Sequence, residues 1–265
     1  MKNLETNEIL EYCNFVTSAI AGGKRELTKY NILPEYLEAH VKSFSNLIEN
    51  KSLVFLGDGD GIGVLVALLA SNSLISTPKE IVVLDIDERK LNLYKTLAEK
   101  QNPHKKVKFE TRLYNVFDKV PLSYANRFDF FHINPPFKAN KKPKGLGFTF
   151  FLERALELTK PEACGIVVYP MADKDMQWAT AVKATLDKTI TKYKLAHQKL
   201  DVTHKYALAQ VVSSNLLVLK NGDVKNKYKG KVIPHSTAKR LYYKDIVSTQ
   251  YINDDGSKDG KYTIN

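Results

Sequence analysis

The chain has 265 residues, 43% of them hydrophobic and 26% charged, which are ordinary proportions for one globular domain with at most a small appendage. Its 40 basic and 29 acidic residues give a formal net charge of +11, which favours polyanionic partners over polycationic ones. The longest apolar run, residues 62–70, is far shorter than the roughly 20 residues of a membrane-spanning helix, so we expect no membrane partner. The opening Met-Lys-Asn-Leu-Glu lacks a basic-then-apolar signal pattern, and we expect a cytoplasmic protein. Cys13 and Cys164 match no metal or redox spacing, which excludes a zinc module and a disulfide scaffold.

The first 50 residues are predicted to form a helical N-terminal extension, because Pro34 can begin a helix and apolar residues then recur at helical spacing through Ile48. From residue 51 on, short apolar runs alternate with amphipathic stretches. Strands are predicted at 53–56, 81–84, 106–111, 128–133 and 165–169, helices at 62–71, 88–101, 148–158 and 176–187, and a strand-rich stretch at 208–219. This alternation over residues 51–220 is typical of an α/β fold with a doubly wound, Rossmann-like parallel sheet.

Two basic groups stand apart from these elements. Four lysines lie between residues 138 and 144, and seven basic residues crowd the stretch from 225 to 244. We therefore treat residues 221–265 as a basic C-terminal segment. Its end, from Asn253, is rich in Asp, Gly and Ser, and we expect this tail to be mobile.

A glycine loop, Gly57-Asp58-Gly59-Asp60-Gly61, follows the first predicted strand, at the end of the sheet where doubly wound folds bind ligands. Its glycines allow a sharp turn and a close approach of a ligand to the backbone. Asp85 ends the second strand, where its carboxylate could accept hydrogen bonds from both ribose hydroxyls. The spacing differs from the G-x-G-x-x-G of dinucleotide sites, and two carboxylates would repel a pyrophosphate. The loop thus favours a nucleoside with a sulfonium or ammonium group: S-adenosylmethionine or its decarboxylated form.

A second motif, Asn134-Pro135-Pro136-Phe137, follows the fourth predicted strand. The two prolines stiffen the chain, so that the Asn134 amide and the carbonyl region of Pro135 point in fixed directions. Amide and carbonyl oxygens could hold an amine nitrogen and orient its lone pair, while Phe137 could stack on a planar ring or line an alkyl channel. We expect catalysis by orientation of two reactants, which requires neither a metal nor a Cys/His nucleophile.

From about residue 52 to 219 the sequence resembles the class I S-adenosylmethionine-dependent transferases, through the glycine loop and the acid after the second strand. The resemblance implies that the loop holds the cofactor tail and that Asp85 binds the ribose. In that family a polar residue after the third strand contacts adenine, and Asn115 is the best match, with Asp118 second. The expected cofactor-binding residues are Gly57, Asp58, Gly59, Gly61, Asp85 and Asn115.

Three segments together are similar to the branched-chain polyamine synthases, which make N4-bis(aminopropyl)spermidine from decarboxylated S-adenosylmethionine. They are Gly-Asp-Gly-Asp at 57–60, Val-Leu-Asp-Ile-Asp-Glu-Arg at 83–89, and the Pro-Pro motif after Phe-Asp at 128–129. The family's own motifs are Gly-Asp-Asp-Asp, Asp-Ile-Asp-Glu-Arg and Asp-Pro-Pro, so Gly59 and Asn134 each replace an acid. The resemblance implies an aminopropyltransferase with a small polyamine substrate, whose ammonium groups Asp58 and Asp60 would hold. The expected catalytic residues are Asn134, Pro135, Phe137 and Asp60.

The Asn-Pro-Pro-Phe motif also resembles the (Asp/Asn)-Pro-Pro-(Tyr/Phe) signature of transferases that methylate exocyclic amines, notably adenine N6. With the positive net charge and the lysines after Phe137, which could neutralise phosphates, it implies an alternative: a nucleic-acid amino-methyltransferase. A binding module that has lost catalysis is disfavoured by the intact glycine loop.

Overall fold

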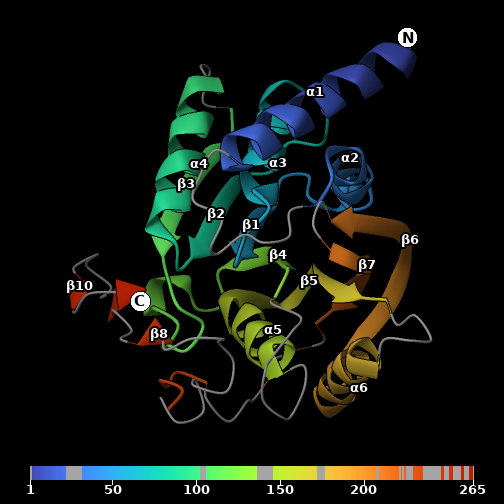
Figure 1. Ribbon diagram of the computed structural model, residues 1–265. Helices are drawn as coiled ribbons and strands as arrows, with labels where there is room; N and C mark the ends of the chain where they lie inside the picture. Colours follow the sequence, from blue (N-terminus) through green and yellow to red (C-terminus); the bar gives the residue numbers. More distant parts are fainter. Residues whose placement is uncertain are drawn as a thin grey trace.

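Figure 1 shows the computed structural model of the chain, which describes residues 2–21, 32–101, 106–135, 146–171, 177–206, 209–220, 222, 224 and 229–234. It also describes four two-residue strands near the C-terminus, which pair antiparallel as β8 with β11 and β9 with β10. These strands are β8 (Ile246–Val247), β9 (Tyr251–Ile252), β10 (Lys258–Asp259) and β11 (Thr263–Ile264).

Seven strands form one sheet in the order β3-β2-β1-β4-β5-β7-β6. Their bounds are β1 (Ser52–Leu56), β2 (Glu80–Asp85), β3 (Lys108–Leu113), β4 (Phe128–Ile133), β5 (Thr159–Pro170), β6 (Ala196–Tyr206) and β7 (Ala209–Leu219). The predicted doubly wound α/β architecture is confirmed, but the sheet is mixed, because β7 runs antiparallel to both β5 and β6. Only two residues separate β6 from β7, and so short a connection permits a hairpin but no crossover to a parallel strand.

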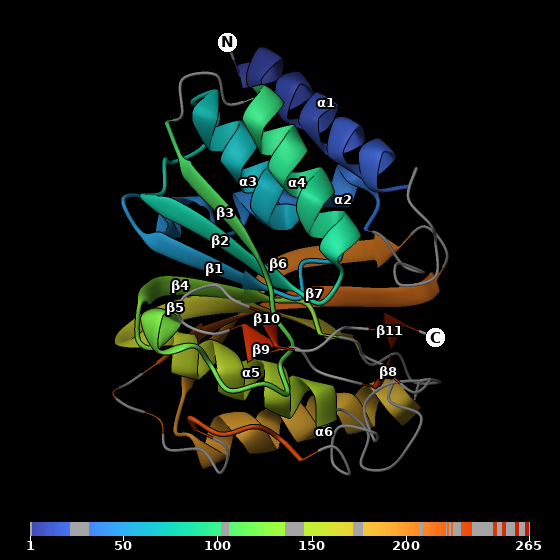
Figure 2. The same ribbon diagram turned by 90° about the vertical axis from the view of Figure 1, so that its left-hand side faces the viewer.

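Helices cover both faces of this sheet, as Figure 2 shows. On one face lie α1 (Lys2–Ala21), α2 (Pro34–Lys42), α3 (Ile62–Ser71) and α4 (Glu88–Gln101), and on the other α5 (Leu146–Leu158) and α6 (Gln177–Lys192). Two short 3₁₀ turns, Ser45–Leu47 and Leu122–Tyr124, complete the regular structure. None of the helices in the described ranges is long and apolar enough to cross a membrane.

The sheet separates two hydrophobic cores. Every residue of β1, β2 and α3 is buried, as expected of parallel strands covered on both faces and of a helix enclosed by its neighbours. The N-terminal helices α1 and α2 contribute apolar side chains to the same core as α3 and α4. Residues 2–21 and 32–50 are thus part of the layer that covers the sheet, and this position brings them close to the ends of the strands.

Candidate active site at the carboxyl ends of the strands

The turn from β1 into α3 depends on two glycines. Gly57 and Gly61 have φ angles of 74° and 71°, in the left-handed region that side chains disfavour. A Cβ atom at Gly57 would lie 2.5 Å from Phe151, and one at Gly61 would lie 2.7 Å from Ile20. A Cβ atom at Gly59 would meet only Nζ of Lys90, at 3.6 Å, among the described residues. The protein's own packing therefore requires the outer two glycines, whereas the middle one borders open space that a ligand could approach.

Replacing Gly61 by Ala should lower the free energy of unfolding by roughly 2 kcal/mol, because the left-handed conformation costs about 1–2 kcal/mol for a residue with a Cβ and Ile20 must also move. The matched control, Gly59→Ala, should leave that free energy within about 0.5 kcal/mol of wild type. Urea titrations of the two variants measure both values. Equal losses would show that the turn does not have this geometry.

Asp58 stabilises the start of α3. Its carboxylate oxygens accept hydrogen bonds from the backbone N–H groups of Ile62 at 2.8 Å and Gly63 at 2.7 Å. The side chain is buried, and this burial raises the pKa of Asp58 to about 7, against the opposing effect of the two N–H donors. Any direct contact of Asp58 with a ligand would have to share oxygens that already bind the helix.

Asp60 lies where three segments of the chain meet. Its Oδ1 accepts the backbone N–H of Ile32 at 3.1 Å, and its Oδ2 accepts Nδ2 of Asn134 at 2.7 Å. Burial raises the pKa of Asp60, while these two donors and the charge of Lys90 act in the opposite direction. The structure thus brings together two residues, Asp60 and Asn134, that the sequence places in separate motifs.

Two residues of α4, which the sequence analysis did not single out, hold the glycine loop from the outside. The hydroxyl of Tyr94 donates to the carbonyl of Asp58 at 2.7 Å, and Nζ of Lys90 donates to the carbonyl of Gly59 at 3.2 Å. Lys90 and Tyr94 stand four residues apart, so they lie on one face of the helix. This four-residue spacing, in the helix that follows the second strand, is the sequence pattern from which the two residues could have been predicted. No side-chain pattern could have indicated Ile32, since it acts through its backbone.

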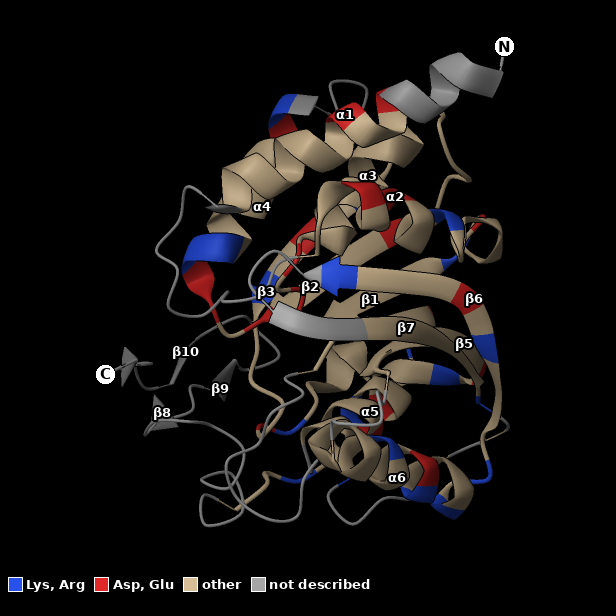
Figure 3. Cartoon of the chain, turned by 45° about the vertical axis from the view of Figure 1, so that its right-hand side comes forward, with Lys and Arg blue, Asp and Glu red and all other residues tan. Residues whose placement is uncertain are grey.

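Asp85 ends β2 beside this loop. Its Oδ1 accepts the backbone N–H of Asp87 at 2.9 Å, and burial raises its pKa, opposed by the charge of Lys90 and by that N–H. Burial would also raise the pKa of Asp87, but Arg89 outweighs it through two hydrogen bonds of 2.9 and 3.0 Å, and the pKa is lowered. Figure 3 shows the acidic and basic residues following one another where β2 leads into α4. Of the two carboxylates that follow β2, Asp87 is therefore occupied by an arginine, whereas Asp85 has no arginine partner among the described residues.

Asn115, the predicted adenine contact, follows β3 at the same edge of the sheet. It is 1% exposed, and its Oδ1 accepts the backbone N–H of Phe117 at 3.1 Å. This hydrogen bond shapes the connection after β3 into a tight turn. The strand ends therefore place Asn115 on the same edge as Asp85, as the class I resemblance implies.

The turn after β3 is held by α5 and by the C-terminal segment. Nε of Arg154 donates to the carbonyl of Val116 at 3.0 Å, and its Nη2 donates to the carbonyl of Lys231 at 2.7 Å. The backbone N–H of Ile233 donates to the carbonyl of Phe117 at 2.7 Å. Residues 229–234 belong to the basic C-terminal segment, which was predicted to be separate from the sheet domain. They contact the turn that carries Asn115.

The remaining predicted residues are only partly described. Pro135 is buried directly after Asn134. Pro136, Phe137 and the lysines between 138 and 144 lie outside the described residues, as does most of the tail after Asn253. The predicted contacts of Phe137 and of these lysines therefore stay predictions.

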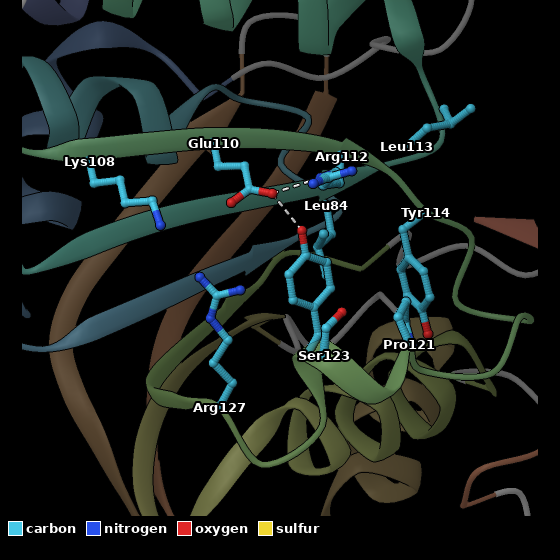
Figure 4. A pocket seen from close by; sticks show the side chains of 10 residues that line it. Leu84, Lys108, Glu110, Arg112, Leu113, Tyr114, Pro121, Ser123 and Arg127 are labelled. Carbon is cyan, nitrogen blue, oxygen red and sulfur yellow. Dashed lines mark hydrogen bonds and ion pairs between the residues drawn. The ribbon is translucent and has the colours of Figure 1, made fainter. Parts of the chain in front are cut away.

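A cavity of about 210 Å³ opens along the edge strand β3 (Figure 4). Its polar wall is internally paired: Glu110 accepts hydrogen bonds from Arg112 at 2.7 Å and from the hydroxyl of Tyr124 at 2.6 Å. Arg127, on the same wall, binds Glu80 at 2.6 Å. None of the predicted site residues lines this cavity, and its basic side chains bind Glu110 or the neighbouring Glu80.

A sequence profile of the family described as the Branched-chain polyamine synthase A C-terminal domain matches residues 39–257. The chain belongs to this family. The matched range contains the whole seven-stranded sheet and every predicted site residue. The family resemblance drawn from the three motifs is thereby confirmed, and with it membership in a family of S-adenosylmethionine-type transferases.

Two curated relatives come from Methanocaldococcus jannaschii. An N(4)-bis(aminopropyl)spermidine synthase is 38% identical over 87 residues, which cover 33% of this chain and 22% of the relative. An uncharacterized protein is 26% identical over 193 residues, which cover 71% of this chain and 45% of the relative. The chain therefore spans less than half the length of these relatives.

Solved structures of the branched-chain polyamine synthase from Thermus thermophilus have the same fold. The C9 mutein, in complex with N4-aminopropylspermidine and 5′-methylthioadenosine, superposes with a TM-score of 0.61 at 17% identity, covering 86% of this chain and 68% of that chain. The branched-chain polyamine synthase in complex with the same two ligands gives 0.58 at 18% identity, covering 78% and 61%. The fold is therefore the class I methyltransferase-like fold that the sequence predicted, preceded by N-terminal helices.

Proposed function

We propose that this protein transfers an alkyl group from an S-adenosylmethionine-type donor to an amine nitrogen, and that the group is the aminopropyl of decarboxylated S-adenosylmethionine. Family membership supports the reaction class. The observation that carries the proposal is the hydrogen bond of 2.7 Å between Asn134 and Asp60 at the carboxyl edge of the sheet. This bond joins the Pro-Pro motif to the glycine loop, so that a donor held by the loop and an amine held by Asn134 would be neighbours.

The residues around the loop suit such a donor. Gly59 borders open space among the described residues, and Asp85 offers a buried carboxyl group at the end of β2. We assign the ribose hydroxyls to Asp85 and the adenine to the turn of Asn115. Gly57 and Gly61 shape the loop against which the sulfonium end would lie. Asp58 binds the start of α3 and would therefore contribute its negative charge to the site without contacting the donor directly.

The orientation of the Asn134 amide defines how the acceptor would bind. A carboxylate can only accept hydrogen bonds, so Nδ2 of Asn134 is the atom that faces Asp60, and Oδ1 is left to accept an N–H from the amine. The amine would use its lone pair to attack the carbon bonded to the sulfonium sulfur. The carbon–sulfur bond would break with both electrons going to sulfur, and the nitrogen would release one proton to solvent. Positioning of the two reactants is then the main contribution of the protein.

Direct comparison of donors tests the proposal. We expect isothermal titration calorimetry to show tighter binding of decarboxylated S-adenosylmethionine than of S-adenosylmethionine, and mass spectrometry to show addition of an aminopropyl group to a polyamine. Methylation of an oligonucleotide with S-adenosylmethionine would instead favour the amino-methyltransferase alternative, whose phosphate contacts would lie between residues 138 and 144. Binding of neither donor at millimolar concentration would contradict the proposal.

Replacing Asn134 by Ala should reduce turnover about 5- to 10-fold, because loss of one orienting hydrogen bond of about 1–1.5 kcal/mol in the transition state has that effect. Among the described residues Asn134 contacts the loop through Asp60, so donor affinity reports on Asp60 and turnover at saturating donor reports on Asn134. Asn134→Asp is the matched variant: it restores the family's acid and should favour more highly charged polyamines. Full activity of Asn134→Ala would remove the basis for this acceptor site.

A further inference from the structure

Three buried histidines form a continuous hydrogen-bonded chain beneath α2. Nε2 of His40 lies 2.8 Å from Nε2 of His132 on β4, and Nδ1 of His40 lies 3.1 Å from Nε2 of His204 on β6. The chain continues from His204 to Oδ1 of Asn215 on β7, at 2.9 Å, and from Nδ2 of Asn215 to Oγ of Ser43, at 2.9 Å. Because β5 and β7 lie between β4 and β6, His40 connects two strands that are not neighbours in the sheet.

The hydrogen bonds fix where the protons of this chain lie. Ser43 Oγ donates to the carbonyl of His40 at 2.7 Å, so it accepts from Nδ2 of Asn215, and Oδ1 of Asn215 faces His204. Nε2 of His204 must then carry the proton, which it shares between Asn215 and Nδ1 of His40. His40 in turn carries its proton on Nε2 and donates it to His132. In this assignment every ring nitrogen on the path from Asn215 to His132 has one role, and one proton on each imidazole, which leaves all three neutral, is sufficient to form the chain.

His40 and His132 join α2 to β4, and each of these two elements is adjacent in the chain to one of the two donors to Asp60. Asn134 lies two residues after His132, directly after the end of β4, and Ile32 lies two residues before the start of α2. Next to Ile32, the backbone N–H of Leu33 donates to the carbonyl of Lys205 on β6, at 3.0 Å. A displacement of α2 from the sheet would therefore move the N–H of Ile32 away from Asp60.

Apolar and aromatic side chains surround the three imidazoles. Phe44 and Phe55 pack against the rings of His40 and His132, with centroids 5.5 and 5.3 Å away. In the described part of the chain no carboxylate makes a hydrogen bond or an ion pair with any of the three imidazoles. The titratable and charged groups on the elements packed around α2 are Glu8, Glu11, Tyr12 and Cys13 on α1 and His197, Lys199, Asp201 and Lys205 on β6. On α2 itself they are Glu35, Tyr36 and the mutually paired Glu38 and Lys42.

We propose that His40, His132 and His204 are positioning residues, whose neutral hydrogen-bonded chain holds α2 against the sheet and keeps the N–H of Ile32 on Asp60, so that the site is lost when the chain takes up a proton. The proposal rests on the proposed function only in giving Asp60 a part in donor and acceptor binding. A proton added at His132 would place two donors face to face, 2.8 Å apart, or would reverse the chain and leave Oδ1 of Asn215 without its donor.

The electrostatic environment agrees with this geometry. Burial lowers the pKa of His132 to about 3, and burial together with the other two imidazoles lowers the pKa of His40. Burial also lowers the pKa of His204, opposed by its hydrogen bonds to Asn215 and to the backbone of Tyr36. The histidines of the unfolded protein take up protons near pH 6.5, whereas those of the folded protein do not. The stability that the three neutral histidines contribute is therefore complete above about pH 6.5 and is lost as the pH falls toward 3.

The test uses a variant that keeps the hydrogen bonds but removes two titratable groups. In His132→Gln/His204→Gln, the amide groups can occupy the positions of the two Nε2 atoms, accepting from His40 at one end and donating to Asn215 at the other. Affinity for 5′-methylthioadenosine and for decarboxylated S-adenosylmethionine is measured by calorimetry from pH 8 to pH 5. The wild type should lose about tenfold or more of its affinity at the acidic end relative to the double variant, since one unit of pKa corresponds to a tenfold change. Asp58, Asp60 and Asp85 also titrate but are common to both proteins, so the difference between them reports the histidines.

Two further measurements keep the test decisive. Imidazole NMR should show three of the six histidines remaining neutral over the pH range in which the wild type keeps its affinity and taking up protons together where the affinity is lost, and the exposed His197→Gln should behave as wild type throughout. In His132→Leu, amide exchange at Ile32 should accelerate about tenfold at pH 8, because His40 loses its acceptor. Ordinary titration of all six imidazoles, or unchanged exchange at Ile32, would overturn the proposal. If neither nucleoside binds wild type, the proposed function fails, while the NMR and exchange results still decide on the chain of histidines.

Discussion

Replacing Asp85 by Ala is expected to weaken binding of the S-adenosyl donor by about 1.5–3 kcal/mol, the usual contribution of hydrogen bonds to a charged group. That loss corresponds to roughly 10- to 150-fold in the dissociation constant. The physical reason is that Asp85 is buried at the end of β2 and has no arginine partner among the described residues, so that ribose hydroxyls would add to the backbone donors of Ile86 and Asp87. Calorimetry on the folded variant measures the change.

Asp87→Ala is the matched control for this prediction. Asp87 lies two residues further on, and both of its oxygens already bind Arg89. Its removal should therefore change donor affinity much less than removal of Asp85. Circular dichroism and thermal unfolding show whether each variant is folded. Equal affinities of wild type and Asp85→Ala would exclude Asp85 as the ribose ligand.

The largest loss of stability is expected for Arg154→Met, at about 3–5 kcal/mol, because it removes the guanidinium group that binds both oxygens of the buried Glu157 carboxylate. Both side chains are almost fully buried, and Nη1 of Arg154 lies 3.0 Å from both oxygens of Glu157. The same substitution removes the donors to Val116 and Lys231 and so frees the turn that carries Asn115. Urea unfolding measures the stability, and calorimetry shows whether donor affinity falls with it.

Two controls separate the buried charge from the lost packing. Arg154→Met/Glu157→Met removes both charges and should recover much of the stability, since paired replacement of a buried ion pair by apolar residues is often neutral. Lys42→Met breaks an exposed pair of the same kind, Lys42 with Glu38 on α2, and should have little effect. A single variant no less stable than the double variant would show that the buried charge is not the cause.

The alternation of apolar runs predicted most of the sheet, because parallel strands buried on both faces must be apolar throughout. The runs at 53–56, 81–84 and 128–133 became β1, β2 and β4 with ends shifted by at most one residue. The direction of β7 was not predictable from periodicity, which is the same for parallel and antiparallel strands. It was decided by the two-residue connection from β6, whose strand the sequence analysis had not assigned.

The candidate site was predictable where the chemistry lies in a motif that ends a strand. The glycine loop, Asp85 and Asn134 follow three parallel strands, and topology alone brings such positions to one edge of a sheet. The specific interactions between them were not predictable. Whether an aspartate of the loop faces a ligand or a helix depends on which backbone N–H groups surround it, and the structure assigns Asp58 to α3 and Asp60 to Ile32 and Asn134.

By itself the sequence determined the fold class, the family and the edge of the sheet where the predicted site lies, since these follow from local patterns of apolar residues and from motifs at strand ends. Only the tertiary structure showed that the N-terminal helices take part in that edge, through Ile32 on Asp60 and Ile20 beside Gly61. It also decided that three histidines distant in the sequence form one buried hydrogen-bonded chain. His132 and His204 lie 92 and 164 residues after His40. Contacts of this range depend on how the helices pack on the sheet, and that packing is a property of the whole core that no local pattern contains.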